Sequence, residues 1–327
     1  MHALILGAAG MIGRRLTDAL AQSGSLGGQA LDALTLVDVV TPAVPDALAG
    51  RVTAQAADLS GTGAAETAIA GRPDVIFHLA AVVSGEAEAD FEKGYRINLD
   101  STRLLFEAIR QAHLAEGYRP RVVFTSSLAV FGAPLPPVIG DDMILTPASS
   151  YGTQKAMGEL LLSDYTRRGF LDGIGLRLPT ICVRPGKPNK AASGFFSGII
   201  REPLAGQEAV LPVPDTVRHW FASPRAATDF LVHAAGIDLA PLGQRRNLTM
   251  PGVSATVAEE IEALRRVAGE RAVALIRREP DPAILRIIET WPEAFATERA
   301  LGLGFRADPS FDAIVALHIA ETGAGPA

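Results

Sequence analysis

The amino-acid sequence predicts an α/β fold in which a doubly wound parallel sheet is joined by a smaller C-terminal α/β lobe. Short aliphatic runs alternate with longer amphipathic stretches as far as residue 178, a pattern typical of strand–helix–strand units. The runs are apolar on both faces, as in sheets that helices cover on each side. A glycine-rich turn follows the first run, and right-handed crossovers then favour the doubly wound topology.

The elements of the first part alternate in order along the chain. The expected strands are 3–6, 34–40, 52–56, 74–78, 121–126 and 173–178. The expected helices are 11–22, 63–70, 91–114 and 150–169. Helices of this length between short strands supply the crossovers that a parallel sheet requires.

The sequence changes character after residue 178. Residues 184–190 form a turn-rich basic loop, and the elements expected beyond it are helices 257–268, 282–290 and 310–321 and a strand near 273–277. Residues 216–250 are expected to return to the main sheet. We therefore expect a large domain of residues 1–178 and about 216–250, a smaller lobe of about 179–215 and 251–322, and a frayed tail of 323–327.

Composition excludes several classes of protein. The chain has 327 residues, a formal net charge of −6 and a single cysteine, Cys182, so we expect neither nucleic-acid binding nor an internal disulfide, and a cytoplasmic location fits. Apolar runs are too short to span a membrane, and the start of the chain has no basic region typical of a secretory signal. The six histidines are scattered, so no metal is expected.

The first strand is followed by the sequence Gly7-Ala8-Ala9-Gly10-Met11-Ile12-Gly13. In such a turn the first glycine permits the sharp bend, the second admits a pyrophosphate and the third lets the helix pack on the sheet. Asp38 ends the second strand, where a carboxylate can bind both ribose hydroxyls of NAD and repel the 2′-phosphate of NADP. The pattern predicts a Rossmann-type NAD-binding domain, although a solvated Asp38 is the simpler alternative.

Two further strand ends belong to the same sheet edge. Asp58 and Leu59 follow the third strand and are expected near the adenine. Residues 79–81 follow the fourth strand, and their small side chains would let the backbone run beside the pyrophosphate. For His78, which ends that strand, we favour a buried, hydrogen-bonded structural role over a catalytic one.

A Ser-Tyr-Lys combination is the most informative feature of the sequence. Ser127 follows a strand, and Tyr151 and Lys155 lie four residues apart on one face of a predicted helix. A neighbouring ammonium favours the phenolate and lowers the phenol's pKa, so Tyr151 can serve as a general base near neutral pH. Ser127 can hold the same substrate oxygen, and Lys155 can also bind the nicotinamide ribose. A surface ion-pairing helix face would be the structural alternative.

These motifs together resemble the extended short-chain dehydrogenase/reductase superfamily, of the NAD-dependent epimerase/dehydratase type, over essentially the whole chain. The resemblance implies that Asn98 lies beside the cofactor, that Pro179 and Thr180 contact the nicotinamide, and that Arg218 binds substrate. The cofactor-binding set then comprises Gly7, Gly10, Met11, Ile12, Gly13, Asp38, Asp58, Leu59, Leu79, Ala80, Ala81, Asn98, Thr125, Tyr151, Lys155, Pro179 and Thr180.

The sequence departs from the sugar epimerases of this superfamily. Phe131 replaces a frequent tyrosine, and Pro179-Thr180 replaces a Phe-Asn pair, which argues against a nucleotide-sugar substrate. The segments 81–88 and 184–194 resemble members that oxidise the C2 hydroxyl of a four-carbon sugar acid with NAD. The substrate-binding residues are then Ser84, Ser127, Tyr151, Lys190, Ser193 and Arg218, with Lys187 and Lys190 facing either substrate or solvent.

The expected function is NAD-dependent oxidation of a small acidic polyhydroxy substrate. A nucleotide-sugar 4-epimerase that retains its NAD uses the same residues and is the first alternative. A dinucleotide-binding sensor or scaffold without chemistry is the second. The resemblance also implies a homodimer formed through helices 91–114 and 150–169.

Overall fold

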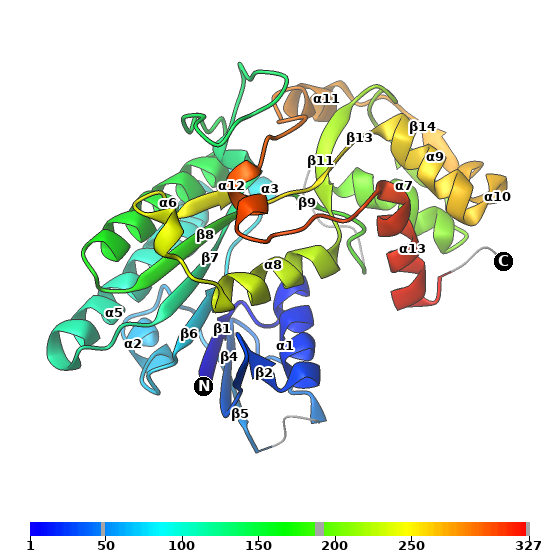
Figure 1. Cartoon of the computed structure of the whole chain (residues 1–327). Coiled ribbons are helices and arrows are strands. Elements are labelled where there is room, and N and C mark those ends of the chain that lie inside the picture. The colour runs from blue at the N-terminus through cyan, green and yellow to red at the C-terminus, as the bar shows by residue number, and fades with distance from the viewer. Residues whose placement is uncertain (47–49, 187–192, 325–327) are drawn as a thin grey trace. The chain divides into compact units, whose positions relative to one another are not determined.

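The computed structural model describes residues 1–46, 50–186 and 193–324. These residues form two compact units (Figure 1). The first unit comprises residues 1–130, 149–177 and 228–249, and the second comprises residues 131–148, 178–227 and 250–327. Because the chain passes between the units several times, neither is a continuous stretch of sequence.

A seven-stranded sheet forms the centre of the first unit. Its strand order is β12-β8-β7-β6-β1-β4-β5, and the pairings of β1 with β4 and β6 are parallel. The strands are β1 His2–Leu6, β4 Ala33–Asp38, β5 Val52–Ala56, β6 Val75–His78, β7 Arg121–Ser127, β8 Asp172–Leu178 and β12 Asn247–Thr249. The order reverses at β1, so the edge between β1 and β6 is the switch point at which doubly wound sheets bind ligands. The predicted fold class is confirmed.

Helices cover both faces of this sheet (Figure 1). Helices α2, α5 and α6 lie side by side on one face, and α1 and α8 lie on the other. The helices are α1 Met11–Ser23, α2 Ala64–Ala68, α3 Ser84–Ala89, α4 Phe91–Gly94, α5 Ser101–Glu116, α6 Ser150–Arg167 and α8 Pro224–Gly236. Residues 3–6 of β1 are fully buried, which explains why this strand is an unbroken apolar run.

The second unit has its own sheets and core. Its strands are β9 Thr180–Ile181, β10 Ala209–Leu211, β11 Arg218–Ala222, β13 Val253–Thr256 and β14 Ile276–Arg278. Strands β13, β11 and β9 form one sheet, and β10 pairs with β14 in another. Its helices are α7 Gly194–Leu204, α9 Val257–Ala268, α10 Glu270–Val273, α11 Pro282–Ile288, α12 Glu298–Gly302 and α13 Phe311–Thr322. Apolar side chains from several of these elements share one buried cluster.

The structure differs from the sequence-based expectation in several places, and the expected strand 34–40 and helix 63–70 are shorter than expected, at Ala33–Asp38 and Ala64–Ala68. The helix expected over 91–114 is interrupted by the π-helical turn η2, Tyr95–Asp100. The strand expected near 273–277 begins only at Ile276, because Glu270–Val273 is a helical turn. Of the segment 216–250, only β12 joins the main sheet, since β11 pairs with β9 and β13 instead. The unit boundaries accordingly differ from those expected, and residues 131–148 also belong to the second unit.

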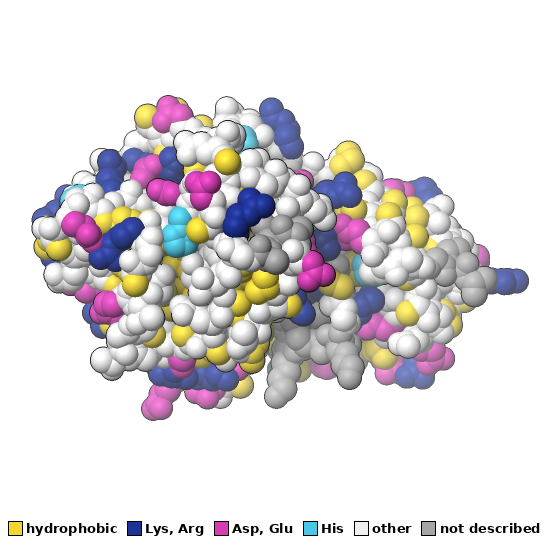
Figure 2. All heavy atoms as spheres, turned by 90° about the horizontal axis from the view of Figure 1, so that it is seen from below, with side chains coloured by type: hydrophobic (Ala, Val, Ile, Leu, Met, Phe, Trp, Pro, Cys, Tyr) yellow, Lys and Arg dark blue, Asp and Glu magenta, His cyan; other side chains and the backbone are white. Residues whose placement is uncertain are grey.

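One face of the described surface is mixed in charge. On the face drawn in Figure 2, Lys and Arg side chains are interspersed with Asp and Glu side chains, without a continuous basic field among the coloured residues. Interspersed signs are typical of a solvated surface and offer little to a polyanion. No helix within the described ranges is both long enough and apolar enough to cross a membrane.

Candidate functional site

The glycine turn after β1 packs tightly against neighbouring backbone. Gly7 has a φ of 91°, and a Cβ added to it would lie 2.6 Å from the backbone nitrogen of Ala80. A Cβ on Gly13 would lie only 2.2 Å from the carbonyl oxygen of Gly7. Both glycines are therefore required by the protein's own packing.

Gly10 differs from the other two glycines. It is exposed and caps α1 with a φ of −68°, a conformation that any residue adopts. A Cβ there would meet only the Gly7 carbonyl oxygen, at 3.3 Å. No side chain caps the helix and no acidic residue occupies its first turn. The amides of Met11 and Ile12 thus begin a helix whose positive end is open to an anion, a cradle that fits a pyrophosphate.

Asp38 is bound to the glycine turn. One carboxylate oxygen accepts a hydrogen bond from the amide of Ala9 at 2.9 Å, and the other accepts from the amide of Val39 at 2.7 Å. The first bond ties the end of β4 to the turn between β1 and α1. A carboxylate offers about four acceptor positions, so Asp38 can hold the turn and still bind ribose hydroxyls.

Asp58 and Leu59 have other contacts at the end of β5. The Asp58 carboxylate accepts from the hydroxyl of Ser60 at 2.6 Å and pairs with Arg96 at 2.7 Å. Hydrogen bonds from Ser60, followed by the hydrogen bond and charge of Arg96, lower the pKa of Asp58. Leu59 is buried in the core, so only its backbone is available to a ligand.

His78 has the structural role expected for it. It is 1% exposed, and Nε2 lies 2.9 Å from the hydroxyl oxygen of Thr102. That hydroxyl donates to the carbonyl of Asn98, so His78 must donate through Nε2, and Nδ1 is buried without a partner among the described residues. Burial lowers the pKa of His78 to about 3, and the nearby Lys155 ammonium acts in the same direction. The imidazole is therefore neutral.

Asn98 connects three segments of the first unit. It lies in the π-helical turn η2, and its side-chain oxygen accepts from the amide of Val82 at 2.9 Å. Its side-chain nitrogen donates to the carbonyl of Val82 and, at 2.7 Å, to Gln154 on α6. Asn98 thereby holds the segment after β6, which contains residues 79–81 and leads into Ser84, relative to α6.

The three predicted catalytic residues lie where β7 ends and α6 begins. Ser127 is the last residue of β7, and its hydroxyl oxygen accepts from the amide of Ala129 at 3.2 Å. Tyr151 is in the first turn of α6, which Ser149 caps by accepting from the amide of Gly152. The Lys155 ammonium lies 5.8 Å from the centre of the Tyr151 ring. The lysine therefore stands beside the tyrosine ring, as the four-residue spacing predicts.

Lys155 is 2% exposed, and its ammonium donates to the carbonyl of Thr125 at 2.9 Å. An ammonium has three donors, so this bond fixes the side chain without exhausting it. Burial lowers the pKa of Lys155 to about 8, while Glu159 acts in the opposite direction. Thr125 itself is buried, and its hydroxyl donates to the carbonyl of His78.

A buried charged pair below these residues was not anticipated from the sequence. Arg177 of β8 donates from Nε and Nη2 to the carboxylate of Glu159 on α6, at 2.9 and 2.7 Å. The Ser126 hydroxyl donates to the same carboxylate at 2.5 Å. The sequence did carry a signal: each charged residue interrupts an otherwise apolar run, at 156–162 and at 173–178, and isolated buried charges require partners.

In the second unit, Thr180 is bonded to a buried histidine. His219 is 2% exposed, its Nδ1 lies 3.0 Å from the carbonyl oxygen of Pro292, and its Nε2 lies 2.6 Å from the Thr180 hydroxyl. The carbonyl can only accept, so Nδ1 carries the proton and Thr180 donates to Nε2. Burial lowers the pKa of His219 to about 4. Pro179 is buried between β8 and β9.

The predicted substrate residues of the second unit have different surroundings. Ser193 is buried, and its hydroxyl oxygen lies 3.4 Å from a guanidinium nitrogen of Arg184. Arg218 pairs with Glu259 at 3.2 Å and contacts Ser254. Lys187 and Lys190 lie outside the described residues.

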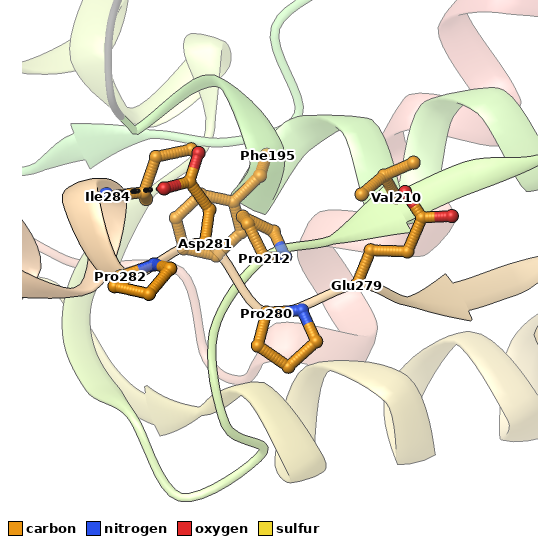
Figure 3. Close-up of a pocket in the computed structure, with 8 residues that line it drawn as sticks. All are labelled: Phe195, Val210, Pro212, Glu279, Pro280, Asp281, Pro282 and Ile284. Atoms are coloured by element: carbon orange, nitrogen blue, oxygen red, sulfur yellow. Dashed lines mark hydrogen bonds between the residues drawn. The ribbon is translucent and has the colours of Figure 1, made fainter.

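A hollow in the second unit does not compete as a site (Figure 3). Six of its eight lining residues are apolar, among them Phe195, Pro212 and Ile284, and the other two are Glu279 and Asp281. Figure 3 shows the Asp281 carboxylate directed at Ile284, where it caps α11 by accepting from two backbone amides. The Asp281 carboxylate is therefore engaged in capping α11. In the described part of the chain, no group of three or more His, Cys, Asp or Glu side chains could hold a metal ion.

The sheet topology and the glycine turn define a dinucleotide-binding α/β protein. The chain belongs to the NAD dependent epimerase/dehydratase family, which matches residues 3–222. It is 52% identical to D-erythronate dehydrogenase of Cupriavidus necator, over 99% of each chain. It is 42% identical to D-erythronate dehydrogenase of Haemophilus influenzae, over 96% of this chain and 98% of that protein.

One solved structure is similar at high identity. It is described as the nucleoside-diphosphate-sugar epimerase from Agrobacterium tumefaciens, with 64% identity, a TM-score of 0.97 and coverage of 99% of this chain and 95% of that chain. The expected superfamily, the NAD cofactor and the class of NAD-dependent dehydrogenase are confirmed by the family and the curated relatives.

Proposed function

We propose that this protein oxidises the C2 hydroxyl of D-erythronate to give 2-dehydro-D-erythronate. The observation that carries this proposal is the near full-length similarity to two D-erythronate dehydrogenases, at 52% and 42% identity. The arrangement of Ser127, Tyr151 and Lys155 supports it, because it supplies a base and an oxygen-binding hydroxyl at one sheet edge.

Tyr151 acts as the general base in this proposal. The Lys155 ammonium, anchored on the carbonyl of Thr125, favours the phenolate by its charge. Ser127 donates its hydroxyl proton to the substrate oxygen and orients the C2–OH bond. The phenolate then removes the hydroxyl proton as the carbon loses hydride.

The turn of residues 7–13 would hold the pyrophosphate of NAD, and Asp38 the adenosine ribose. When bound, NAD supplies the hydride acceptor. The exposed Gly10 and the open helix start fit an anionic group, and the remaining acceptor positions of Asp38 fit a diol. The rest of the proposed cofactor site comprises Asp58, the Leu59 backbone, residues 79–81, Asn98, Thr125, Pro179 and Thr180.

The substrate carboxylate and hydroxyls would be bound by Ser84, Lys190, Ser193 and Arg218. Arginine and serine suit this task because a guanidinium group binds a carboxylate and a serine hydroxyl can donate to or accept from a substrate hydroxyl. In the structure Arg218 is shared with Glu259, so substrate would compete with that carboxylate for the guanidinium.

We further propose a cytoplasmic homodimer. Helices α5 and α6 carry the exposed side chains of Leu114 and Leu160, 62% and 68% accessible. Apolar side chains so exposed on adjacent helices suit burial against a second copy. Light scattering of Leu160→Glu against the wild type tests this, and an unchanged dimer mass in the variant would contradict it.

A nucleotide-sugar epimerase is the second candidate, favoured by the 64% identity to a solved structure described as such an epimerase. Both activities remove hydride from carbon, but an epimerase returns it to the opposite face and leaves free NAD unchanged. Four- and five-carbon aldonates and UDP-sugars, each with NAD or NADP, distinguish the candidates. Net formation of reduced NAD with D-erythronate supports the dehydrogenase, whereas epimerised sugar without net reduction supports the alternative.

A further inference from the structure

Helix α6 carries a second buried charge one turn after Lys155. Glu159 is four residues further along, so its side chain projects from the same face of the helix. The side chain is 2% exposed. Burying a carboxylate is costly unless charged and hydrogen-bonding partners compensate, and this one has several.

The contacts of Glu159 hold it from two strands. Arg177 of β8 forms a two-pronged pair, with Nη2 at 2.7 Å from one oxygen and Nε at 2.9 Å from the other. Ser126 of β7 donates at 2.5 Å. Because all these partners donate hydrogen bonds, the Glu159 side chain accepts them as an ionised carboxylate. The planar guanidinium of Arg177 fixes the orientation of that carboxylate.

The same contacts reach the residues of the proposed mechanism. Ser126 immediately precedes Ser127, and Thr125, whose carbonyl accepts from Lys155, immediately precedes Ser126. The Glu159 carboxylate therefore fastens α6 to the end of β7, one residue before Ser127 in the strand and one helical turn after Lys155 in the helix. Replacing it would alter both a position and a charge.

We propose that Glu159, clamped by Arg177 and Ser126, is a positioning residue that serves as the counter-ion of the buried Lys155 and keeps it an ammonium beside Tyr151. The consequence for catalysis rests on the proposed function, whereas the charge state of Lys155 does not.

Other charged or titratable groups around Lys155 do not substitute for Glu159. His78 of β6 is neutral, Tyr151 belongs to the mechanism, and Arg177 of β8 is positive. Burial already lowers the pKa of Lys155 to about 8, and Glu159 is the charge that opposes this effect. Loss of the carboxylate should therefore remove the ammonium at a lower pH.

The lysine content makes a direct test practical. The whole chain contains four lysines, Lys93, Lys155, Lys187 and Lys190, so the full-length protein labelled with ¹³C at lysine Cε gives four titrating signals. The signal absent from Lys155→Arg identifies Lys155. We expect its midpoint to fall by about one pH unit in Glu159→Gln, because loss of a nearby opposite charge shifts a pKa by about one to three units.

Two further variants make the result decisive. Asp164→Asn removes an exposed negative charge from the same helix and should leave the midpoint unchanged. If Glu159→Gln fails to fold because Arg177 has lost its carboxylate partner, Glu159→Gln with Arg177→Met removes both charges, and its midpoint should fall by a smaller interval, because loss of the positive Arg177 charge favours the ammonium. An unchanged midpoint in the Glu159 variants, or an equal fall in Asp164→Asn, would overturn the proposal.

A kinetic measurement adds the catalytic consequence. With D-erythronate and NAD, the alkaline limb of the kcat profile should move to lower pH in Glu159→Gln by the same interval as the lysine midpoint, with KM changed little. A limb that stays in place would overturn the catalytic part. If the wild type does not oxidise D-erythronate, the proposed function fails while the lysine titration still decides the role of Glu159.

Discussion

Gly10, Gly7 and Gly13 look equivalent in the sequence and are not equivalent in the structure. Gly7 and Gly13 are held by neighbouring backbone, whereas Gly10 is exposed in an ordinary conformation. Because the fold itself does not require a glycine at position 10, a bound pyrophosphate is the reason we propose for its small size. This distinction separates a structural glycine turn from a binding one.

Gly10→Ala should therefore weaken NAD binding by roughly tenfold or more while changing the unfolding free energy by less than about 1 kcal/mol. Gly13→Ala is the matched comparison, since its Cβ would overlap the Gly7 carbonyl, and it should destabilise the fold. Calorimetric NAD titration and urea unfolding measure the two effects. Unchanged NAD affinity in Gly10→Ala would exclude it from the pyrophosphate site.

Asp38→Asn should narrow the preference for NAD over NADP. The amide keeps an acceptor for the Ala9 amide and loses the acceptor that the Val39 amide uses, while it removes the charge that repels a 2′-phosphate. We expect the ratio of kcat/KM values for NAD and NADP to fall by about tenfold or more. An unaltered ratio, with normal stability, would show that Asp38 only supports the turn.

At the scale of elements, strands such as β5 and helices such as α9 were predictable because apolar runs and periodicity are local signals. The π-helical turn η2 was not predictable, since its residues continue a helical pattern and its Asn98 bonds to Val82 and Gln154, which are distant in sequence. Similarly, Tyr151 and Lys155 could be paired by helical spacing, whereas Arg177 and Glu159 meet only after β8 and α6 pack. The Thr180–His219 bond joins two strands of the second unit and carried no sequence signal.

The packing of α6 on β7 depends on Gly158. A Cβ there would lie 2.7 Å from the ring of Phe124, so Gly158→Ala should destabilise the protein by about 1–3 kcal/mol and lower kcat by displacing Tyr151. Adding Phe124→Leu removes the obstructing ring atoms and should restore part of both. The measurements are the free energy of urea unfolding and the kcat of the single and double variants. A Gly158→Ala variant with the stability and kcat of the wild type would contradict this account of the packing.

At the scale of the whole molecule, two of the buried histidines, His78 and His219, predict loss of stability in acid. His78 and His219 have folded pKa values of about 3 and about 4, against about 6.5 when unfolded. The unfolded chain binds more protons between these values, so stability is complete above pH 6.5 and falls as the pH drops towards 4. Each histidine contributes roughly 1.4 kcal/mol per pH unit. In urea unfolding, the free energy of unfolding of His78→Gln should fall less steeply with decreasing pH than that of the wild type, between about pH 6.5 and 4.5. An equally steep fall in the two proteins would refute the buried neutral state of His78.

The most direct test of the proposed chemistry is the rate of NAD reduction by wild type and Tyr151→Phe with D-erythronate and excess NAD. We predict that the wild type accumulates reduced NAD in proportion to substrate consumed. The variant should be slower by about 10²–10⁴-fold, with its calorimetric NAD affinity retained. A variant that reduces NAD as fast as the wild type would contradict the role of Tyr151 as the base.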